Sequence, residues 1–383
     1  MTLSGFVVRN TFRNRRRSLL TLLSIGFSLL LLTLMVSIWR TFYVEVGAPD
    51  SVKRVITRDR VSLAFLLPSY YREKIRSVPG VVAVAPMTWF GGRYKDDRPE
   101  NFFAQIATDP DEYLKVASDK IVPPDQVSAW QHDRAGALVD ITLANKYGWK
   151  IGDKITLLGT IFPANPELTI RGIYRRDPPQ NALYFNSKYL EESVDWFKGR
   201  AGWYSTQVGS AEDVARVSSE IDTMFRNSPE RTKTESEKAF QLSFVATLGN
   251  VKAFILGICG AVVFAILLVS ANTMAMSVRS RTREVAVLKT LGFTRQRVLS
   301  LFVFESVALA VSGGLLGILG AAGLIQWLTH SPIAIGIPIN MKVTLPTVGL
   351  SLLVAATVGF LSGYVPAYGA SRTSIVEGLR HIG

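Results

Sequence analysis

Four long stretches without Asp, Glu, Lys or Arg constrain this chain most, and they cover residues 18–39, 253–278, 306–329 and 343–371. Each exceeds the about 20 residues that an α-helix needs to cross about 30 Å of hydrocarbon. A soluble core rarely accommodates four such runs in one chain of 383 residues. We therefore expect four transmembrane helices, the third beginning near Val298 and so including Glu305.

The basic residues predict which helix ends share one side of the membrane. Outside residues 40–252 there are 14 Lys and Arg residues, and 13 of them lie within 9–17, 279–297 and 372–380. Four crossings place these three clusters on the same side, and positive residues favour the cytoplasmic side. We expect both termini and the loop 279–297 to be cytoplasmic, and residues 40–252 and the short loop 330–342 to be external.

The net charge of +13 follows from this topology and does not indicate a nucleic-acid partner. Residues 40–252 hold 29 basic and 27 acidic residues, a balance of +2, so that +11 lies close to the membrane. Basic clusters at this position favour anionic lipid headgroups. We therefore expect membrane lipid, and no nucleic acid, among the partners.

The loop 279–297 carries six Lys and Arg residues against the single acid Glu284. Its apolar residues Val285, Leu288 and Leu291 have helical spacing. Gly292 is a suitable helix stop, and Thr294 can cap the helix that follows. The pattern predicts a small helix on the cytoplasmic face, shaped to contact a partner.

The first 17 residues and the first apolar run form the N-terminal anchor. Leu3 and Phe6 interleave with Arg9 and Arg13, which predicts a short helix lying in the headgroup plane. The apolar run 18–39 is longer than the about 7–15 residues of a signal-peptide core, so we expect it to remain uncleaved.

The segment 40–252 is long enough for one or two compact domains, and its pattern predicts an α+β fold. Expected strands cover residues 81–85, 102–107, 137–139, 154–158, 168–174, 183–185 and 204–208. Expected helices cover residues 68–77, 141–147, 188–197 and 211–226. Thr234 and Glu237 have capping-box spacing, so a stalk helix is expected to begin near Glu235 and continue into the second span.

The residues available for catalysis are few. The histidines and the cysteine are His132, His330, His381 and Cys259. Their positions fit no metal-ligand spacing, and Cys259 is interpreted as a packing residue inside the second span. No GxxxxGK(S/T) phosphate loop is present, so we expect no ATP hydrolysis by this chain. External acids such as Asp109, Asp111 and Glu112 are more often solvated than catalytic.

Small residues and one acid stand out within the spans. The glycines lie at positions 313, 314, 317, 320, 323, 359 and 363. In lipid, this spacing favours close helix contacts either within one protomer or between two. Glu305 lies deep enough to need either a partner such as Arg283 or Arg372 or a water-filled cavity, and a structural ion pair near the inner interface is the simpler interpretation.

Three segments resemble the signature regions of the MacB/FtsX-like ABC transporter permease family. They are VVRNTFRNRRRSLLTLLSIG near the N-terminus, REVAVLKTLGFTRQRVLSLFVFES in the loop and third span, and PAYGASRTSIVEGLR near the C-terminus. The external part, with SYYREKIRSVPGVVAVAP and ALVDITLANKYGWKIGDKITLLG, is similar to the periplasmic domain of that family. Ala286 departs from the Gly of many members.

The resemblance implies a membrane α-helical protein with four transmembrane helices and an α+β periplasmic domain between helices 1 and 2. The expected segments are a cytoplasmic amphipathic helix 1–17, helix 1 at 18–39, the periplasmic domain at 40–252, helix 2 at 253–278, a coupling loop at 279–297, helix 3 at 298–329, a periplasmic loop at 330–342, helix 4 at 343–371 and a cytoplasmic tail at 372–383. Within the periplasmic domain, porter-like lobes are expected at 50–125 and 200–233, an inserted lobe at 126–199 and a stalk at 234–252.

The resemblance also implies partners. A separate cytoplasmic ABC ATPase is expected to use ATP and Mg²⁺, while this chain binds no cofactor itself. The residues expected to couple to it are Arg283, Glu284, Val285, Leu288, Lys289, Leu291 and Gly292. A second copy of the permease, a periplasmic adaptor and an outer-membrane channel are further expected partners, and the bacterial inner membrane is the expected location.

Three functions are compatible with this resemblance. The first is MacB-type export of an amphiphilic substrate from the outer side of the inner membrane. The second is transmission of force to a cell-wall hydrolase, as in FtsX, and the third is release of lipoproteins. The length of the external segment fits an exporter or a lipoprotein-releasing permease better than a small hydrolase-regulating domain, and so favours export over force transmission.

Overall fold

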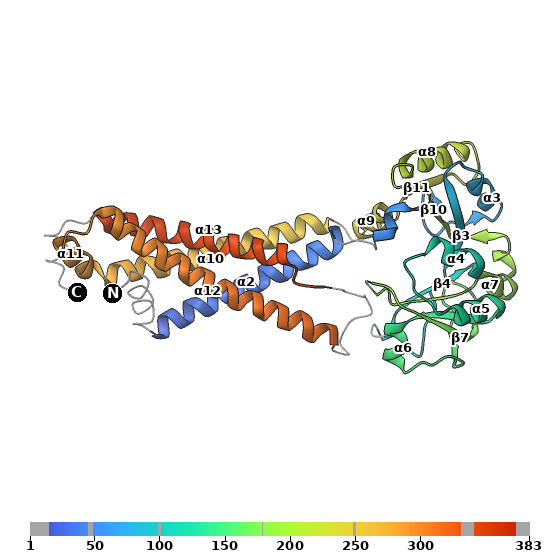
Figure 1. Ribbon diagram of the computed structural model, residues 1–383, viewed down its shortest axis with the longest axis horizontal. Helices are drawn as coiled ribbons and strands as arrows, with labels where there is room; N and C mark the ends of the chain where they lie inside the picture. Colours follow the sequence, from blue (N-terminus) through green and yellow to red (C-terminus); the bar gives the residue numbers. More distant parts are fainter. Residues whose placement is uncertain are drawn as a thin grey trace. The chain divides into compact units, whose positions relative to one another are not determined.

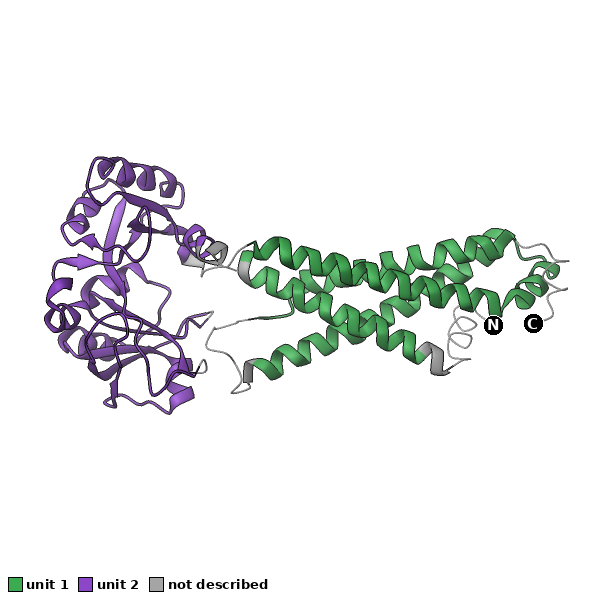
Figure 2. Ribbon diagram, turned by 180° about the vertical axis from the view of Figure 1, so that it is seen from behind, with its two compact units in different colours: residues 1–44, 249–329, 341–383 green, residues 45–248, 330–340 purple. Residues whose placement is uncertain are grey.

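A computed structural model describes residues 15–44, 49–98, 101–177, 179–247, 250–330 and 341–372. Most of the expected helix 1–17, most of the expected loop 330–342 and the tail after Arg372 lie outside the described residues. The chain divides into two compact units, coloured separately in Figure 2. The first holds residues 1–44, 249–329 and 341–383, and the second holds residues 45–248 and 330–340.

Among its described residues, the first unit contains four helices long and apolar enough to span a membrane, as expected from the sequence (Figure 1). They are α2 (Arg15–Tyr43), α10 (Val251–Ser280), α12 (Arg295–His330) and α13 (Leu345–Arg372). Each of the four overlaps one of the predicted runs. The described helices α2, α10 and α12 extend beyond both ends of their runs because charged residues such as Arg40 and Lys252 continue the helix.

One apolar cluster in the interior of this unit joins α2, α10 and α13. Ile25, Leu29 and Leu32 of α2 pack with Ile266 of α10 and Val358 of α13. Side-chain hydroxyls bond across the same interfaces, for example Ser270 to Ser362 at 2.7 Å. In an apolar solvent such interhelical bonds satisfy polar groups that would otherwise be unpaired.

The second unit is a mixed sheet with helices on it. Its nine strands have the order β11-β1-β10-β3-β4-β8-β5-β7-β6, with β4–β8 and β5–β7 parallel and the other pairs antiparallel. These strands are β1 (Arg54–Asp59), β3 (Val81–Trp89), β4 (Ala104–Thr108), β5 (Gly136–Asp140), β6 (Lys154–Thr156), β7 (Glu167–Tyr174), β8 (Ala182–Asn186), β10 (Trp203–Val208) and β11 (Thr232–Ser236). A small second sheet pairs β2 (Leu67–Pro68) with β9 (Arg200–Ala201).

The order of these strands divides the sheet into two halves. We call β11, β1, β10, β3 and β4 the first half, and β8, β5, β7 and β6 the second half. The second half comes from residues 126–199, where an inserted lobe is expected, and the parallel β4–β8 pair joins it to the first half. Hydrogen bonding therefore continues across the boundary between the expected lobes.

Helices cover this sheet and connect its strands. They are α3 (Tyr71–Arg76), α4 (Pro110–Val116), α5 (Pro124–His132), α6 (Ile141–Tyr147), α7 (Ser187–Ser193), α8 (Val214–Met224) and α9 (Glu237–Thr247), with 3₁₀ turns η1 (Pro49–Lys53) and η3 (Asp195–Phe197). The helix expected at 188–197 is interrupted because Val194 is extended, at φ −142°. The sequence pattern did not predict α4, α5, β1 or β11.

The stalk helix begins later than expected. Glu235 belongs to strand β11, where it pairs with Ile56 of β1, and α9 starts at Glu237. The Thr234 amide bonds to Asp222, and the Ser236 hydroxyl accepts a bond from the Ala239 amide at 3.2 Å. The capping residue is therefore Ser236. A separate helix, α10, begins at Val251, and the Asn250 side chain caps it.

Candidate functional site

A short helix, α11 (Thr282–Thr290), lies between the spans α10 and α12. It ends as its sequence predicts, because Gly292 adopts φ +87°, a conformation that suits glycine. The Phe293 amide donates to the Leu288 carbonyl at 3.1 Å across this turn. Thr294 then caps α12, accepting a bond from the Arg297 amide.

One face of α11 is packed against the chain's own helices. Val285 is 2% exposed and belongs to an apolar cluster with Val298 and Phe302 of α12 and Ala367 of α13. The Lys289 ammonium donates to the Ser371 carbonyl of α13 at 2.7 Å. Burial lowers the pKa of Lys289, and the nearby Arg295 lowers it further. These contacts hold α11 against the ends of the spans.

The opposite face of α11 is open. Arg283, Val287 and Leu291 are exposed and follow one another at four-residue spacing, which places them on one side of a helix. Val287 is 44% and Leu291 72% exposed. We call these three residues the outer stripe. The predicted apolar face of Val285, Leu288 and Leu291 therefore divides: Val285 points into the chain, Leu288 is half-buried and Leu291 is open.

Glu305 forms an ion pair within the chain. Its side chain is 4% exposed, and the Arg281 guanidinium lies 2.8 Å from its Oε2 atom. The partner is thus Arg281, at the end of α10, and not Arg283 or Arg372 as expected. Neither Arg281 nor Val287 stood out in the sequence. The four-residue spacing of Arg283, Val287 and Leu291 was the one local signal available for the outer stripe.

Six of the seven glycines singled out in the spans pack against another helix of this chain. A Cβ atom at Gly317 of α12 would lie 2.5 Å from the Gly26 carbonyl oxygen of α2. At Gly363 of α13 it would lie 2.6 Å from Cβ of Ser306 of α12. Both positions therefore bring two helix backbones closer than a larger side chain permits. Gly323 has no such neighbour within 4 Å among the described residues.

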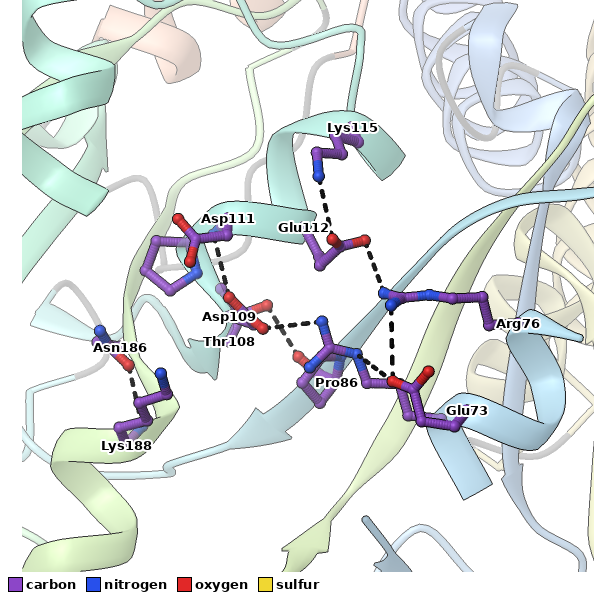
Figure 3. Close-up of polar contacts among 12 residues, drawn as sticks. Glu73, Arg76, Pro86, Thr108, Asp109, Asp111, Glu112, Lys115, Asn186 and Lys188 are labelled. Atoms are coloured by element: carbon purple, nitrogen blue, oxygen red, sulfur yellow. Dashed lines mark hydrogen bonds and ion pairs between the residues drawn. The ribbon is translucent and has the colours of Figure 1, made fainter. Parts of the chain in front are cut away.

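Two of the three external acids singled out in the sequence, Asp109 and Glu112, have structural partners, while the Asp111 side chain is exposed (Figure 3). Asp109 caps α4 by accepting a bond from the Asp111 amide at 3.0 Å, and it pairs with Arg72 of α3 at 2.9 Å. Glu112 pairs with Arg76 of α3 at 3.0 Å. These ion pairs fasten α3 to α4, and the carboxylates serve that packing.

The described residues contain no group of three or more His, Cys, Asp or Glu placed to hold a metal ion. Cys259 lies on α10, where it packs beside the apolar cluster shared by α2, α10 and α13. Its environment is that of a small apolar packing residue.

Four apolar helices, an anchored basic helix between two of them and an α/β unit between the first and second define a multi-pass membrane protein with a large extramembrane domain. Residues 18–224 match the MacB-like periplasmic core domain, and residues 252–375 match the FtsX-like permease C-terminal domain. The chain belongs to the MacB/FtsX-like ABC transporter permease family. Membership implies an ATPase partner in general.

Several known proteins are similar in sequence to this chain. An uncharacterized ABC transporter permease of Methanocaldococcus jannaschii, MJ1507, is 24% identical over 98% of this chain and 96% of its own length. The uncharacterized permease YknZ of Bacillus subtilis is 32% identical over 64% of this chain, which covers 62% of that relative. The macrolide export protein MacB of Rhodopirellula baltica is 37% identical over 29% of this chain and 15% of its own length.

Two solved structures resemble the chain at low similarity. The extracellular domain of YknZ has a TM-score of 0.35 at 13% identity, covering 48% of this chain and 99% of that one. The periplasmic region of MacB from Actinobacillus actinomycetemcomitans has a TM-score of 0.36 at 9% identity, covering 55% of this chain and 97% of that one.

Proposed function

We propose that this chain is the permease subunit of a MacB-type ABC exporter. ATP binding and hydrolysis by a separate cytoplasmic ATPase, with Mg²⁺, would drive movement of the second unit (residues 45–248 and 330–340), which we call the external unit. That movement would expel an amphiphilic substrate from the outer side of the inner membrane through a periplasmic adaptor and an outer-membrane channel. The chain itself would have no ATPase site and would act as one half of a homodimer.

The observation that carries this proposal is the two-sided character of α11. Its inner face is fixed to α12 and α13 by Val285 and Lys289, while Val287 and Leu291 remain open beside basic residues. An exposed apolar stripe on an anchored helix is suited to a protein groove. Because α11 follows α10 directly and is packed against α12 and α13, a force applied to the outer stripe would act on the ends of these three spans.

The charge pattern supports the orientation in which α11 meets a cytoplasmic protein. The loop holding α11 carries six Lys and Arg residues, and the positive-inside rule then supports a cytoplasmic location for this loop and for both termini. Sequence similarity supports the export reading, since the name of the Rhodopirellula relative describes macrolide export. Force transmission and lipoprotein release remain the alternatives, and an experiment on the native complex separates the three.

Mass spectrometry of the complex purified from its native membrane tests the proposal. An ABC ATPase together with an adaptor supports export. A cell-wall hydrolase or a lipoprotein carrier in place of the adaptor would replace export with one of the alternatives. Absence of any ATPase would contradict the proposal as a whole.

Substitutions in the outer stripe test the role of α11. Val287→Asp or Leu291→Asp places a charge on the proposed contact, so we expect the ATPase to be lost from the complex and stimulated hydrolysis to fall. Val61→Asp is the matched control, because Val61 is 80% exposed on the external unit and should have no effect. Unchanged hydrolysis in both α11 variants would show that α11 does not contact the ATPase.

A further inference from the structure

The two segments that connect the external unit to the spans meet at one ion pair. Arg54, the first residue of β1, follows η1 and the end of α2, and Glu237 is the first residue of α9. The Arg54 Nε atom lies 2.8 Å from Glu237 Oε2, and the side chains are 5% and 12% exposed. Only three residues separate the end of α9 from the start of the span α10. The pair therefore joins the segment that follows the first span to the segment that precedes the second.

Asp119 extends this contact into both halves of the sheet. Its Oδ1 atom accepts a bond from Arg54 Nη1 at 2.7 Å, and its Oδ2 atom accepts one from Arg176 Nε. Arg54 belongs to the first half of the sheet, whereas Arg176 follows strand β7 of the second half. A continuous line of charges therefore runs from the beginning of α9 to both halves.

The environment keeps Asp119 and Arg54 ionised. Burial raises the pKa of Asp119, but the adjacent cations Lys120, Arg54 and Arg176 outweigh it and hold that pKa below its ordinary value. Burial disfavours the charged form of Arg54, and the carboxylates of Glu237 and Asp119 outweigh it, so its pKa is raised. Attraction between buried charges is stronger than at the surface because water screens it less.

The hydrogen bonding of Arg54 is incomplete in this conformation. Within the described part of the chain, its Nε and Nη2 atoms are buried without a hydrogen-bond partner, so charge attraction holds Glu237 without a well-aligned bond. A buried donor without a partner destabilises the conformation that contains it. A small displacement of α9 can therefore change the geometry of this contact without breaking a saturated network.

The rest of α9 is fastened to the first half of the sheet near the same place. Phe240 of α9 lies with its ring centroid 6.4 Å from that of Trp203 in β10. The strand before α9 is held by Arg58 of β1, whose Nε atom lies 3.1 Å from Glu235. The contact of α9 with the second half of the sheet is indirect, because it runs from Glu237 through Arg54 and Asp119 to Arg176.

We propose that Glu237, Arg54, Asp119 and Arg176 form a joint that passes movement of the α9–α10 segment to both halves of the external sheet. These are positioning residues, and they touch no substrate in this role. The inference rests on the proposed function, since an ATPase must move the spans before the joint can transmit anything. A purely structural role for the same residues would affect stability but not the response to nucleotide.

Hydrogen exchange of the complete complex tests the joint. The chain is purified from native membranes with its ATPase, placed in lipid nanodiscs and compared with and without ATP, Mg²⁺ and vanadate. In the unsubstituted complex we expect nucleotide to change exchange in α11, in α9 and in residues 110–122 and 168–184. Exchange reports local opening, so it detects movement without knowledge of the substrate.

Glu237→Gln removes the charge at the beginning of α9 while keeping its size. We expect the response of α11 and α9 to persist and that of residues 110–122 and 168–184 to fall about fivefold or more, the lower end of coupling factors between sites. Glu237→Asp keeps the charge and should restore most of the response. Lys154→Gln is the control, since Lys154 and Glu167 form an exposed ion pair in the same sheet.

The outcomes separate the joint from the proposed function. An equal nucleotide response of residues 110–122 in the Glu237→Gln, Glu237→Asp and unsubstituted complexes overturns the joint while leaving the proposed function standing. No response of α11 in the unsubstituted complex overturns the proposed function, and the joint falls with it. If Glu237→Gln unfolds the external unit, Arg176→Gln decides the question, because it breaks the contact of Asp119 with the second half. A response of residues 168–184 equal to that in Lys154→Gln overturns the joint, and a reduced one supports it.

Discussion

Gly317 shows how closely α2 and α12 approach each other. A Cβ atom at this position would lie 2.5 Å from the Gly26 carbonyl oxygen and 2.8 Å from the Leu30 amide nitrogen. These are backbone atoms, so they cannot rotate away as a flexible side chain would. The contact is therefore closed to every residue larger than glycine unless the helices separate.

Gly317→Ala should therefore destabilise the transmembrane unit by about 1–3 kcal/mol, as overpacking of a well-packed core does. The measurement is thermal unfolding of the purified chain in detergent. Gly323→Ala is the control on the same helix, because no other helix in the described part of the chain comes within 4 Å of its added Cβ atom. Equal midpoints for the two variants would show that α2 and α12 do not pack as described.

Lys120 is a buried cation held against aromatic rings. Its ammonium lies 5.1 to 5.4 Å from the ring centroids of Tyr113, Tyr174 and Tyr184. Burial, opposed in part by Asp119, lowers the pKa of Lys120 to about 7 from 10.5. The other charged groups that act on it are Arg54, Arg176 and Glu237. Its protonation therefore changes near neutral pH.

The sign of the pH dependence follows from this lowered pKa. Between about pH 7 and about pH 10.5 the unfolded chain binds a proton at Lys120 that the folded chain does not, so this group makes stability rise with pH. Below about pH 7 both states are protonated, and its contribution to the slope disappears. Lys120→Met should flatten the rise in stability of the external unit with pH. Hydrogen exchange of the full chain from pH 6 to 10 measures this stability.

Lys115→Met provides the comparison for that measurement. Lys115 is exposed and pairs with Glu112 on the surface of α4, so its removal should leave the slope above neutral pH unchanged. A Lys120→Met chain with the same pH slope as the Lys115→Met chain would show that Lys120 does not titrate near pH 7.

At the scale of elements, the ion pair of Arg281 and Glu305 joins the end of α10 to α12. Removing one partner of a buried pair leaves a charge behind and costs about 3–5 kcal/mol, whereas replacing both by apolar residues is often neutral. Glu305→Gln should therefore lower the unfolding midpoint in detergent. Arg281→Met with Glu305→Met should recover most of it, and failure of the double variant to recover would contradict the pairing.

Elements differ in how far their sequences predict them. The spans are predicted because a run of more than about 20 apolar residues has few other stable environments. Strands β1 (RVITRD) and β11 (TKTES) were missed because they are rich in charged and hydroxyl side chains, which the structure pairs with one another. Thr57 and Thr234, for example, are buried together at 3.0 Å. Such pairing depends on residues far apart in the chain.

The candidate site could be predicted only in part, because some of its features follow from local spacing and others from contacts between residues far apart in the chain. The helix between the spans, its end at Gly292 and the cap at Thr294 follow from local spacing. The orientation of that helix does not, because Val285 and Leu291 are both apolar and only contacts with α12 and α13 decide which of them is buried. The joint at Arg54 was not predictable locally, since its four residues come from four separate segments.

At the scale of the whole molecule, charge is distributed unequally between the membrane-proximal segments and the external unit. Residues 40–252 have a balance of +2, although they contain 29 of the 43 basic residues. The remaining basic residues, apart from Lys342, fall in three clusters that four crossings bring to one side. This distribution indicates an orientation, because translocation of Lys and Arg clusters is disfavoured.

Labelling of single cysteines tests this orientation. Cys259→Ala removes the one native thiol, after which Ala129→Cys places a thiol on α5 and Thr290→Cys places one at the end of α11, both at exposed positions. A membrane-impermeant maleimide should label Ala129→Cys in intact spheroplasts and label Thr290→Cys only after the membrane is opened. Both variants should react fully in detergent, which controls for burial of the thiol. Labelling of Thr290→Cys in intact spheroplasts would reverse the topology, and α11 would then lie on the side where no ATP-driven partner can reach it.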